Sequence, residues 1–433
     1  MDSKNQRQAC IIRTGQGEDI TRHNINVGGN NIEELFVGID ISKDFFDVCI
    51  KDVRNNPLFA DKRYEQNQNG FNKFDIDLKP FWKLSKGQMV FGMESTGIYH
   101  LNLYEHLRRN GIFPHVINPI EIDKKAKNRI RKTRTDKIAA DIIAEKLITD
   151  ARPEQQYILE PNLYGLREHC RILYRLRNEM NKCKVKVTRD LDILCYGYDK
   201  LFDNNLSPSS IAVMKLAFRK TRFLDVTETE LVKAISPYYG RQRDAVEKAE
   251  RLTTLFSTSE PPEYLKEPLL LELHLLINQY ELLKTQMDRV KRKIEKSTSQ
   301  LKTRIKSIIG IGDFTGGLIL GELGDIRRFE SSKKVVAFAG LDPILKESGS
   351  SRREGHISKR GSPMLREALF LAAFPASKYN PVCKPLYDRL RAKGKHHNLC
   401  LTAVARKLLL IVYSVLKNDR DFYIPEHLNK TEK

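Results

Sequence analysis

Residues 269–301 carry apolar side chains at alternating spacings of four and three, and this repeat constrains the fold more than any other feature of the chain. Its members are Leu269, Leu273, Leu276, Tyr280, Leu283, Met287, Val290, Ile294 and Leu301. Because the spacing persists over four heptads and fails only at Ser297, it predicts a long helix with a coiled-coil seam. The seam could pack on an antiparallel helix of the same chain or on a second subunit. In either case we expect a spacer and assembly element without catalytic residues.

The rest of the chain predicts an α/β fold joined to helical segments, the class α/β plus α. Apolar runs typical of strands lie at 35–41, 46–50, 89–93 and 113–117. A helical stretch over 97–109 precedes the last of these runs. Strand, helix and strand in this order indicate a mixed sheet. We therefore expect four parts: a disordered tail over 1–34, an α/β domain over 35–158, a helical and coiled-coil linker with an insertion over 159–301, and a mostly helical domain over 302–433. Within the linker we expect a long basic helix over 163–195 and shorter helices over 209–256.

The balance of charge indicates a polyanionic partner. The 433 residues include 75 Lys and Arg against 55 Asp and Glu, a formal net charge of +20. Such a surplus favours nucleic acid, since cationic side chains displace the counterions of a phosphate backbone. A content of 30% charged residues, without a run of about 18 apolar ones, argues against a membrane protein. Seven cysteines without a CxxC pair favour a reducing cytoplasm over a disulfide framework or a zinc ribbon.

One short segment concentrates the positive charge. Eight cations fall within residues 124–137, namely Lys124, Lys125, Lys127, Arg129, Arg131, Lys132, Arg134 and Lys137. The segment could be a solvated surface. In a chain of this charge we expect a phosphate-binding face, with Lys132, Arg134 and Lys137 among its nucleic-acid contacts.

Three acidic residues are candidate metal ligands. Asp40 follows a β-run within GIDISK, Glu94 ends another within MEST, and Asp136 begins the helix after the basic segment. Carboxylates at strand ends of one sheet edge can converge on Mg²⁺, which would stabilise a phosphodiester exchange. Each residue alone could equally be a turn former or a helix cap.

The C-terminal part contains a serine-rich loop followed by cations. Ser348 opens the sequence SGSS, and Arg352, Arg353, Lys359, Arg360 and Arg366 follow it. A serine hydroxyl in such a loop could attack a phosphodiester while the arginines bind its non-bridging oxygens. The alternative is a phosphate-contact loop without a nucleophile.

A second glycine turn precedes this loop. Gly310 and Gly312 flank Ile311 ahead of a helix of small residues, a pattern that resembles a helix-hairpin-helix. The backbone N–H groups of such a turn can approach phosphate. The alternative is a tight corner between helices that touches no ligand.

Four motifs taken together resemble one known family. GIDISKDFFDV, MESTGIY, RKTRTDK and the pair GLDP with GHISKRGSPMLR occur in this order in the chain. They resemble the DEDD-type insertion-sequence transposases of the one-ten family, which includes the pilin-gene invertase and bridge-RNA-guided recombinases. The resemblance covers roughly 35–150 and 302–420.

The resemblance implies a mechanism and partners. The N-terminal part would be a RuvC-like, ribonuclease-H-type domain that binds Mg²⁺, with Asp40, Glu94 and Asp136 as three of its four acidic residues. Ser348 would be the nucleophile that forms a phosphoserine link to DNA, with Ser350 and Ser351 as alternatives. A structured non-coding RNA would select donor and target DNA in a bacterial, nucleoid-associated cytoplasmic reaction. Composite sites would form in a dimer or tetramer.

One position departs from the family pattern TDxxDA. The chain reads TDKIAAD, so Ala139 occupies the fourth acidic position, and Asp141 comes five residues after Asp136. At about 100° per residue, positions 136 and 141 differ by roughly 140° around a helix. Either Ala139 impairs the enzyme, or three carboxylates suffice with another ligand, for which Asp141 is a candidate. The competing interpretations are a RuvC-like junction-resolving nuclease and an inactive nucleic-acid-binding remnant.

Overall fold

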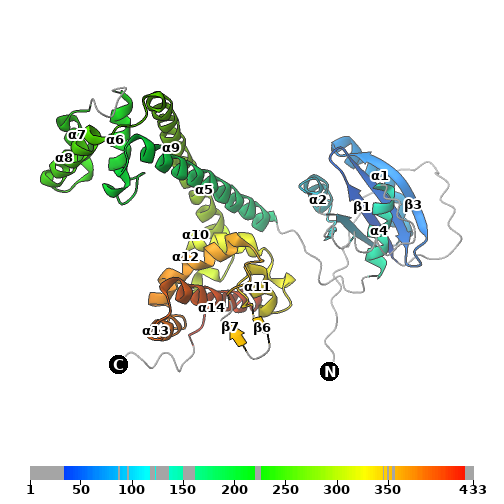
Figure 1. The fold of residues 1–433 in the computed structure, drawn as a ribbon. Helices are drawn as coiled ribbons and strands as arrows, with labels where there is room; N and C mark the ends of the chain where they lie inside the picture. Colours follow the sequence, from blue (N-terminus) through cyan, green and yellow to red (C-terminus); the bar gives the residue numbers. More distant parts are fainter. Residues whose placement is uncertain are drawn as a thin grey trace. The chain divides into compact units, whose positions relative to one another are not determined.

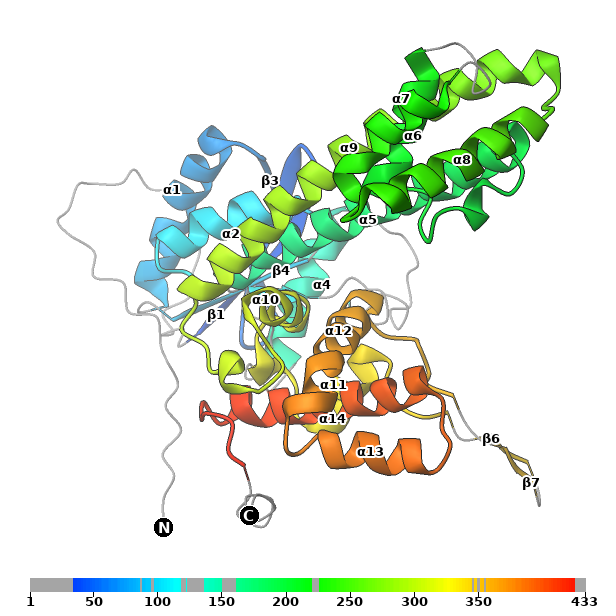
Figure 2. The same ribbon diagram turned by 90° about the vertical axis from the view of Figure 1, so that its left-hand side faces the viewer.

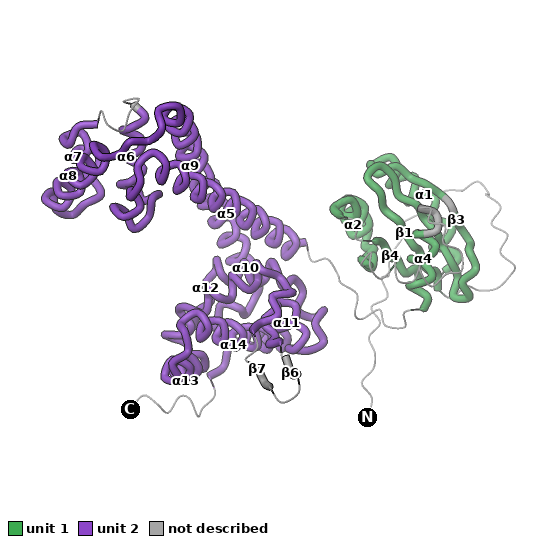
Figure 3. Tube along the Cα trace, in the orientation of Figure 1, with its two compact units in different colours: residues 1–160 green, residues 161–433 purple. Residues whose placement is uncertain are grey.

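The chain forms two compact units, residues 1–160 and 161–433, which Figure 3 shows in different colours. Figure 1 labels their helices and strands. The computed structural model describes residues 34–85, 88–94, 97–117, 122, 136–149, 161–219, 226–344, 346–348, 351–353 and 356–424. Residues 1–33 of the expected tail and residues 124–135 of the basic segment therefore lie outside the described residues. Each unit is considered by itself.

The first unit is built on a mixed five-stranded sheet with the order β3-β2-β1-β4-β5. Its elements along the chain are β1 (Leu35–Ile41), β2 (Phe45–Asp52), β3 (Pro57–Glu65), α1 (Gln68–Leu84), β4 (Met89–Glu94), α2 (His100–Arg109), β5 (His115–Ile117) and α4 (Asp136–Thr149). The first three strands are antiparallel neighbours, whereas β4 runs parallel to both β1 and β5. The expected mixed sheet is confirmed.

The alternation of residues along the strands gives the sheet two covered faces. On one face Phe46 of β2 packs against Phe71 and Phe74 of α1 with ring-centroid distances of 6.0 and 5.4 Å. On the other face Phe36 of β1 belongs to a cluster with Ile143 of α4. Because successive strand residues point to opposite faces, Phe36, Gly38 and Asp40 share the face that α4 covers.

Sequence patterns located four of the five strands and missed one hairpin arm. Residues 57–65 form β3, although this strand interrupts apolar positions with Asp61, Lys62 and Arg63. The β2–β3 turn is set by Asp52, whose carboxylate accepts hydrogen bonds from the backbone N–H groups of Arg54 and Asn56 at 2.9 and 2.8 Å. Charged side chains are common on edge strands, and this composition hid β3 from the apolar pattern.

Two long helices form the axis of the second unit. They are α5 (Pro161–Leu194) and α9 (Glu263–Gln300), and Figures 1 and 2 show them side by side. The N-terminal half of α5 packs with the C-terminal half of α9, where Leu173 shares a cluster with Ile294. The other two halves meet in a second cluster that holds Val187 and Leu273. The apolar repeat therefore packs on an antiparallel helix of the same chain, the first of the two alternatives.

The segment between these helices forms a small helical cluster at one end of the pair. Its helices are α6 (Pro208–Arg219), α7 (Glu228–Ile235) and α8 (Gln242–Thr258). Thr227 begins α7 with a capping box, in which its hydroxyl accepts from the N–H of Glu230. Buried apolar residues of these helices join the cluster of α5 and α9, as expected for shorter helices over 209–256.

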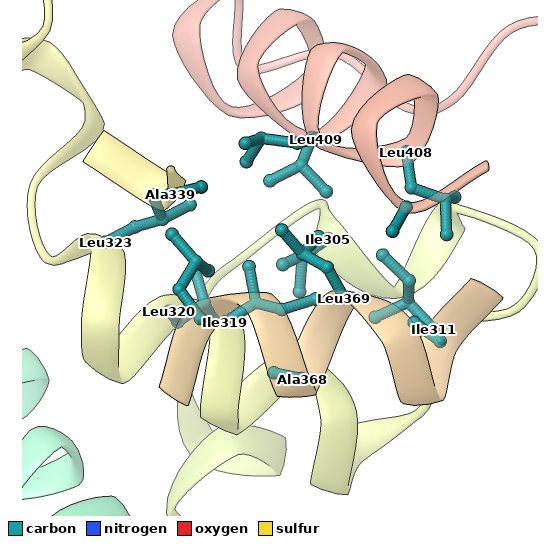
Figure 4. Packing of buried hydrophobic residues seen from close by; sticks show 14 of the residues in the cluster. Ile305, Ile311, Ile319, Leu320, Leu323, Ala339, Ala368, Leu369, Leu408 and Leu409 are labelled. Atoms are coloured by element: carbon teal, nitrogen blue, oxygen red, sulfur yellow. The ribbon is translucent and has the colours of Figure 1, made fainter. Parts of the chain in front are cut away.

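The C-terminal segment folds around a second core. Its elements are α10 (Asp313–Leu323), α11 (Ser332–Ala339), the hairpin β6 (Lys346–Ser348) and β7 (Ser351–Arg353), α12 (Pro363–Tyr379), α13 (Lys384–Ala392) and α14 (His397–Lys417). Figure 4 shows Ile319 of α10, Leu369 of α12 and Leu408 of α14 meeting in this core. Among the described helices, α14 alone is long and apolar enough to span a membrane. Its side chains Leu401, Leu408 and Val412 are buried within this core.

Candidate active site

Two of the predicted acidic residues are neighbours in the sheet. In the parallel pair of β1 and β4, Gly38 lies opposite Gly92 and Ile39 lies opposite Met93. Asp40 and Glu94 are the next residues of the two strands, so they lie side by side at the carboxyl ends. Strand alternation puts both on the face covered by α4. Both side chains are partly exposed.

Two glycines allow α4 to lie very close to this face. A Cβ atom at Gly38 would come within 2.1 Å of the carbonyl oxygen of Ala140 and 2.4 Å of the amide nitrogen of Ala144. A Cβ at Gly92 would meet Leu147 at 2.9 Å. The backbone of α4 therefore packs directly on the strands that end in Asp40 and Glu94.

The contact between Gly38 and Ala140 relates the start of α4 to the end of β1. Asp136, the first residue of α4, comes one helical turn before Ala140, and Asp40 comes two residues after Gly38. Both positions are thus about 6–7 Å along their elements from the Gly38–Ala140 contact. The side chain of Asp136 lies outside the described residues. Ala139 is partly exposed on α4.

The structure gives Asp141 a different partner. Its carboxylate forms an ion pair with the ammonium group of Lys51, and the thiol of Cys49 lies 3.8 Å away. In the antiparallel pair of β1 and β2, Lys51 lies opposite Phe36 and Cys49 lies opposite Gly38. Neither lies opposite Asp40. Asp141 therefore contacts β2 at residues that lie opposite Phe36 and Gly38, two to four residues before Asp40.

The structure places a further carboxylate next to Asp40 that the sequence patterns did not predict as part of the site. Asp47 of β2 lies directly opposite Asp40 and is 4% exposed. Both of its oxygens accept hydrogen bonds from Arg63 of β3, from Nε at 3.0 Å and from Nη2 at 2.8 Å. A row of Arg63, Asp47, Asp40 and Glu94 therefore crosses four strands. The signal in the sequence was the Asp of FFDV, which pairs with Asp40 only once the hairpin register is known.

The donor chemistry of this edge suits a hard divalent cation. Within the part of the chain that the structure describes, no three His, Cys, Asp or Glu side chains come together in a metal-binding group. Asp40 and Glu94 offer two adjacent carboxylates, and Asp47 is engaged by Arg63. Carboxylate oxygens are the ligands that Mg²⁺ takes in proteins, usually one or two of them with water. The residues present are therefore compatible with Mg²⁺.

A nearby histidine adds no positive charge to this face. His115 of β5 lies opposite Gly92 of β4. Burial lowers the pKa of His115 to about 4. The imidazole is therefore neutral at pH 7.

Ser348 lies at the end of a strand in the C-terminal hairpin. In the register of β6 and β7, Ser348 is opposite Ser351 and Glu347 is opposite Arg352. The side chains of residues 346–348 and 351–353, which include Arg353, lie outside the described residues. The backbone thus places two of the three candidate serines as a cross-strand pair next to a two-residue loop.

The base of this hairpin is firmly anchored. The amide of Ile344 donates to the carbonyl of His356 at 2.9 Å, and the hydroxyl of Ser358 donates to the carboxylate of Asp342 at 2.6 Å. Lys359 has a positive φ of 54°, and its amide donates to the carbonyl of Gly340 at 3.1 Å. Lys359 and Arg360 are exposed and available for contact with a partner.

The motif GSPMLR, residues 361–366, stabilises the segment at the base of the hairpin. Ser362 caps α12 by accepting from the N–H of Leu365 at 3.2 Å, and its hydroxyl donates to buried Glu322 at 2.7 Å. Arg366, predicted to bind nucleic acid, donates instead to the carbonyls of Ala339 and Gly361 at 3.0 and 2.8 Å. These bonds hold the end of α11 against the start of α12.

The glycine turn before α10 has the features of a tight corner. Gly310 has a φ of 103°, and a Cβ there would lie 2.8 Å from the Cβ of Ala376 in α12. A groove at the turn is lined by Gly310 and Gly312 but also by the carboxylates of Glu295 and Asp313. The carboxylate of Asp313 is paired with Lys306 at 3.1 Å. Because the close approach of Ala376 already requires a glycine at position 310, the geometry favours the corner between helices.

The remaining predicted contacts come from the basic segment. Lys132 and Arg134 lie outside the described residues, as does the side chain of Lys137 in the first turn of α4. Their role in binding nucleic acid stays a prediction.

Two family profiles match the chain, the first across the boundary between the two units and the second within the second unit. The profile of the DEDD transposases of the IS110 type, described as a transposase, matches residues 37–195. The profile described as the transposase IS116/IS110/IS902 family matches residues 302–388. The first match contains the acidic strand ends and α4, and the second contains the serine hairpin.

Individual relatives extend this similarity over most of the chain. The pilin gene-inverting protein of Moraxella bovis is 23% identical over 402 residues, which cover 90% of this chain and 98% of the relative. The transposase of insertion sequence element IS1328 from Yersinia enterocolitica is 24% identical over 386 residues, 88% and 96% of the two chains. An uncharacterized 43.6 kDa protein of insertion element IS110 from Streptomyces coelicolor is 34% identical over 119 residues, only 29% of its length.

The two profiles and the full-length relatives define an enzyme of DNA recombination, a transposase. Within that class, the chain belongs to the IS110 family of insertion-sequence transposases.

Proposed function

We propose that this transposase exchanges DNA strands at the ends of an insertion element, using an acidic Mg²⁺ site in the first unit and a serine nucleophile in the second. The observation that carries the proposal is the register of β1 and β4, which supports Asp40 and Glu94 as adjacent ligands beside the start of α4. Asp136 would supply the third carboxylate, because residue 136 precedes Ala140 by four and shares its helix face. A bound Mg²⁺ would neutralise charge on a phosphodiester.

The second half of the proposal assigns the covalent step to Ser348. Its Oγ would attack phosphorus and lose its proton, the bond from phosphorus to one strand oxygen would break, and that oxygen would leave as a hydroxyl. The hydroxyl of a second cleaved strand would then attack the phosphoserine, which joins the two strands and releases Ser348. Support comes from the anchored hairpin, which would hold the serine at a fixed distance from its base. Exposed Lys359 and Arg360 would bind non-bridging oxygens.

We further propose the partners of the reaction. The net charge of +20 suits both the element DNA and a structured non-coding RNA that would select the sites by base pairing. Because the acidic residues and Ser348 belong to separate compact units, composite sites in a dimer or tetramer would bring them together. The reaction would take place in the bacterial cytoplasm, at the nucleoid.

Recombination in cells tests the acidic site. The assay combines the chain, the RNA encoded beside the element, a donor-junction plasmid and a target plasmid, and compares Ala139 with Ala139→Asp. We expect Ala139→Asp to raise recombination at least tenfold, because a fourth carboxylate one turn from Asp136 adds a ligand and charge compensation. Equal rates would show that three carboxylates suffice and would contradict an impaired site.

Trapping of a covalent adduct tests the serine. Denatured reactions of Ala139→Asp with labelled DNA should contain a protein–DNA adduct that Ser348→Ala abolishes, whereas Ser350→Ala and Ser351→Ala retain it. Cleavage without any adduct would favour the junction-resolving nuclease, in which water attacks. Tight, salt-dependent DNA or RNA binding without cleavage at any Mg²⁺ concentration would favour the inactive remnant.

A further inference from the structure

A buried ion pair joins the helix of the acidic site to the sheet. Lys51 of β2 is 4% exposed, and its ammonium group pairs with the carboxylate of Asp141 in α4. The same ammonium donates to the side-chain oxygen of Asn55 at 2.9 Å. Asp141 also accepts from the thiol of Cys49 at 3.8 Å. Such partners offset the loss of water around a buried ammonium group.

This pair adds a directional contact to the apolar packing between α4 and the sheet. The apolar contacts include those of Ala140 and Ala144 at Gly38, of Leu147 at Gly92 and of Ile143 with Phe36. Small and aliphatic groups tolerate sliding and rotation, whereas an ion pair with fixed partners does not. Lys51 and Asp141 therefore contribute to fixing the rotation and translation of α4 over β1 and β2.

The position of α4 matters because the helix begins at Asp136. Asp141 is five residues further along, about 7.5 Å along the helix axis. A helix is stiff over this length, so an anchor at Asp141 also determines where residue 136 stands relative to Asp40 and Glu94.

The geometry argues against the other role for Asp141, that of a fourth metal ligand. Cys49, whose thiol donates to Asp141, lies opposite Gly38, which is two residues from Asp40 along β1, about 7 Å. A carboxylate already paired with Lys51 would have to leave a buried cation to reach the strand ends.

We propose that Lys51 and Asp141 are positioning residues that hold the N-terminal end of α4, and with it Asp136, against the carboxylates of Asp40 and Glu94. The inference rests on the proposed metal site and deepens it. Asp141, the sixth residue of α4, would act on the site through its ion pair with Lys51 on β2 and not as a metal ligand.

Calorimetric titration of the full chain with Mn²⁺, followed by thermal unfolding of each variant, tests the proposal. Lys51→Met removes the anchor and frees Asp141. The double variant Lys51→Met/Asp141→Leu replaces the buried pair with apolar side chains, a change that such sites often tolerate. We expect both variants to bind Mn²⁺ at least tenfold more weakly, and the double variant to unfold within a few degrees of the wild type.

A second ion pair of the same unit provides the matched control. Lys62 of β3 pairs with Asp77 of α1 on the opposite face of the sheet, so Lys62→Met removes a pair without touching α4. This control should bind Mn²⁺ as the wild type does.

The outcomes separate the two proposals. If Lys51→Met binds Mn²⁺ as well as or better than the wild type while Asp141→Leu binds it poorly, Asp141 is a ligand and the positioning role is refuted. If a folded double variant keeps wild-type affinity, the pair is only structural and the inference is likewise refuted. If Asp40→Asn leaves Mn²⁺ binding unchanged, the proposed metal site itself fails, and this inference fails with it.

Discussion

Replacement of Gly38 by alanine should separate α4 from the sheet. The added Cβ would lie 2.1 Å from the carbonyl oxygen of Ala140 and 2.4 Å from the amide nitrogen of Ala144. Both atoms belong to the helix backbone, so no side-chain rotation can relieve the overlap. Since Cβ atoms essentially never approach another heavy atom within 3.0 Å, α4 must retreat by about 1 Å or more.

The expected cost follows from this displacement. Overpacking of a close contact typically costs about 1–3 kcal/mol, and an overlap with two backbone atoms belongs at the upper end. For a unit of this size, about 3 kcal/mol corresponds to a fall in Tm of about 6–12 °C. Mn²⁺ affinity should fall as well, because Asp136 moves with α4.

Differential scanning calorimetry of the full chain measures the effect. Gly165→Ala in α5 is the matched control, because a Cβ at Gly165 meets nothing within 4 Å and alanine favours a helix by about 0.5–1 kcal/mol. A Gly38→Ala chain whose Tm and Mn²⁺ affinity equal those of the wild type would refute the close packing of α4 on β1.

Three further predictions concern single contacts. Ser362→Ala should destabilise the second unit by about 1–3 kcal/mol in urea unfolding, because it removes the cap of α12 and the hydroxyl bonded to buried Glu322; a loss under 0.5 kcal/mol would contradict this. His115 has its pKa lowered to about 4 in the folded chain from 6.5, so the stability it supports is present above pH 6.5 and is lost as the pH falls toward 4. The free energy of unfolding of the wild type should therefore fall by up to about 3 kcal/mol more than that of His115→Leu between pH 7 and pH 4, and parallel curves would refute the burial effect. Leu408→Ala should cost about 2–5 kcal/mol, measured by the same urea unfolding, because Leu408 is fully buried in the C-terminal core.

The amino-acid pattern alone was sufficient to predict the two long helices. The repeat from Leu269 onward predicted α9, and the basic stretch over 163–195 predicted α5, which spans Pro161–Leu194. Helical periodicity is a local property, so the residues of each segment are enough to predict its helix. The four motifs likewise indicated the family that the two profiles identify.

What the repeat packs against is not a local property. The same spacing would suit a second subunit, and only the tertiary structure pairs Leu273 with the end of α5 that carries Val187. The small helices over 208–258 join that cluster, although their own sequences give no indication of where they dock.

For the candidate site, too, some features could be predicted from the sequence and others depend on the tertiary structure. Asp40 and Glu94 could be recognised from the sequence because each ends an apolar run. Their adjacency depends on the register of β1 and β4, and the pairing of Asp47 with Arg63 depends on the register of a hairpin whose last strand has no apolar signal. Asp141 is the clearest case: residue type and spacing allowed a metal ligand, whereas the folded chain pairs it with Lys51, ninety residues earlier. Sequence determines which groups a helix or strand carries, but which groups face one another is decided by contacts between segments distant in the chain.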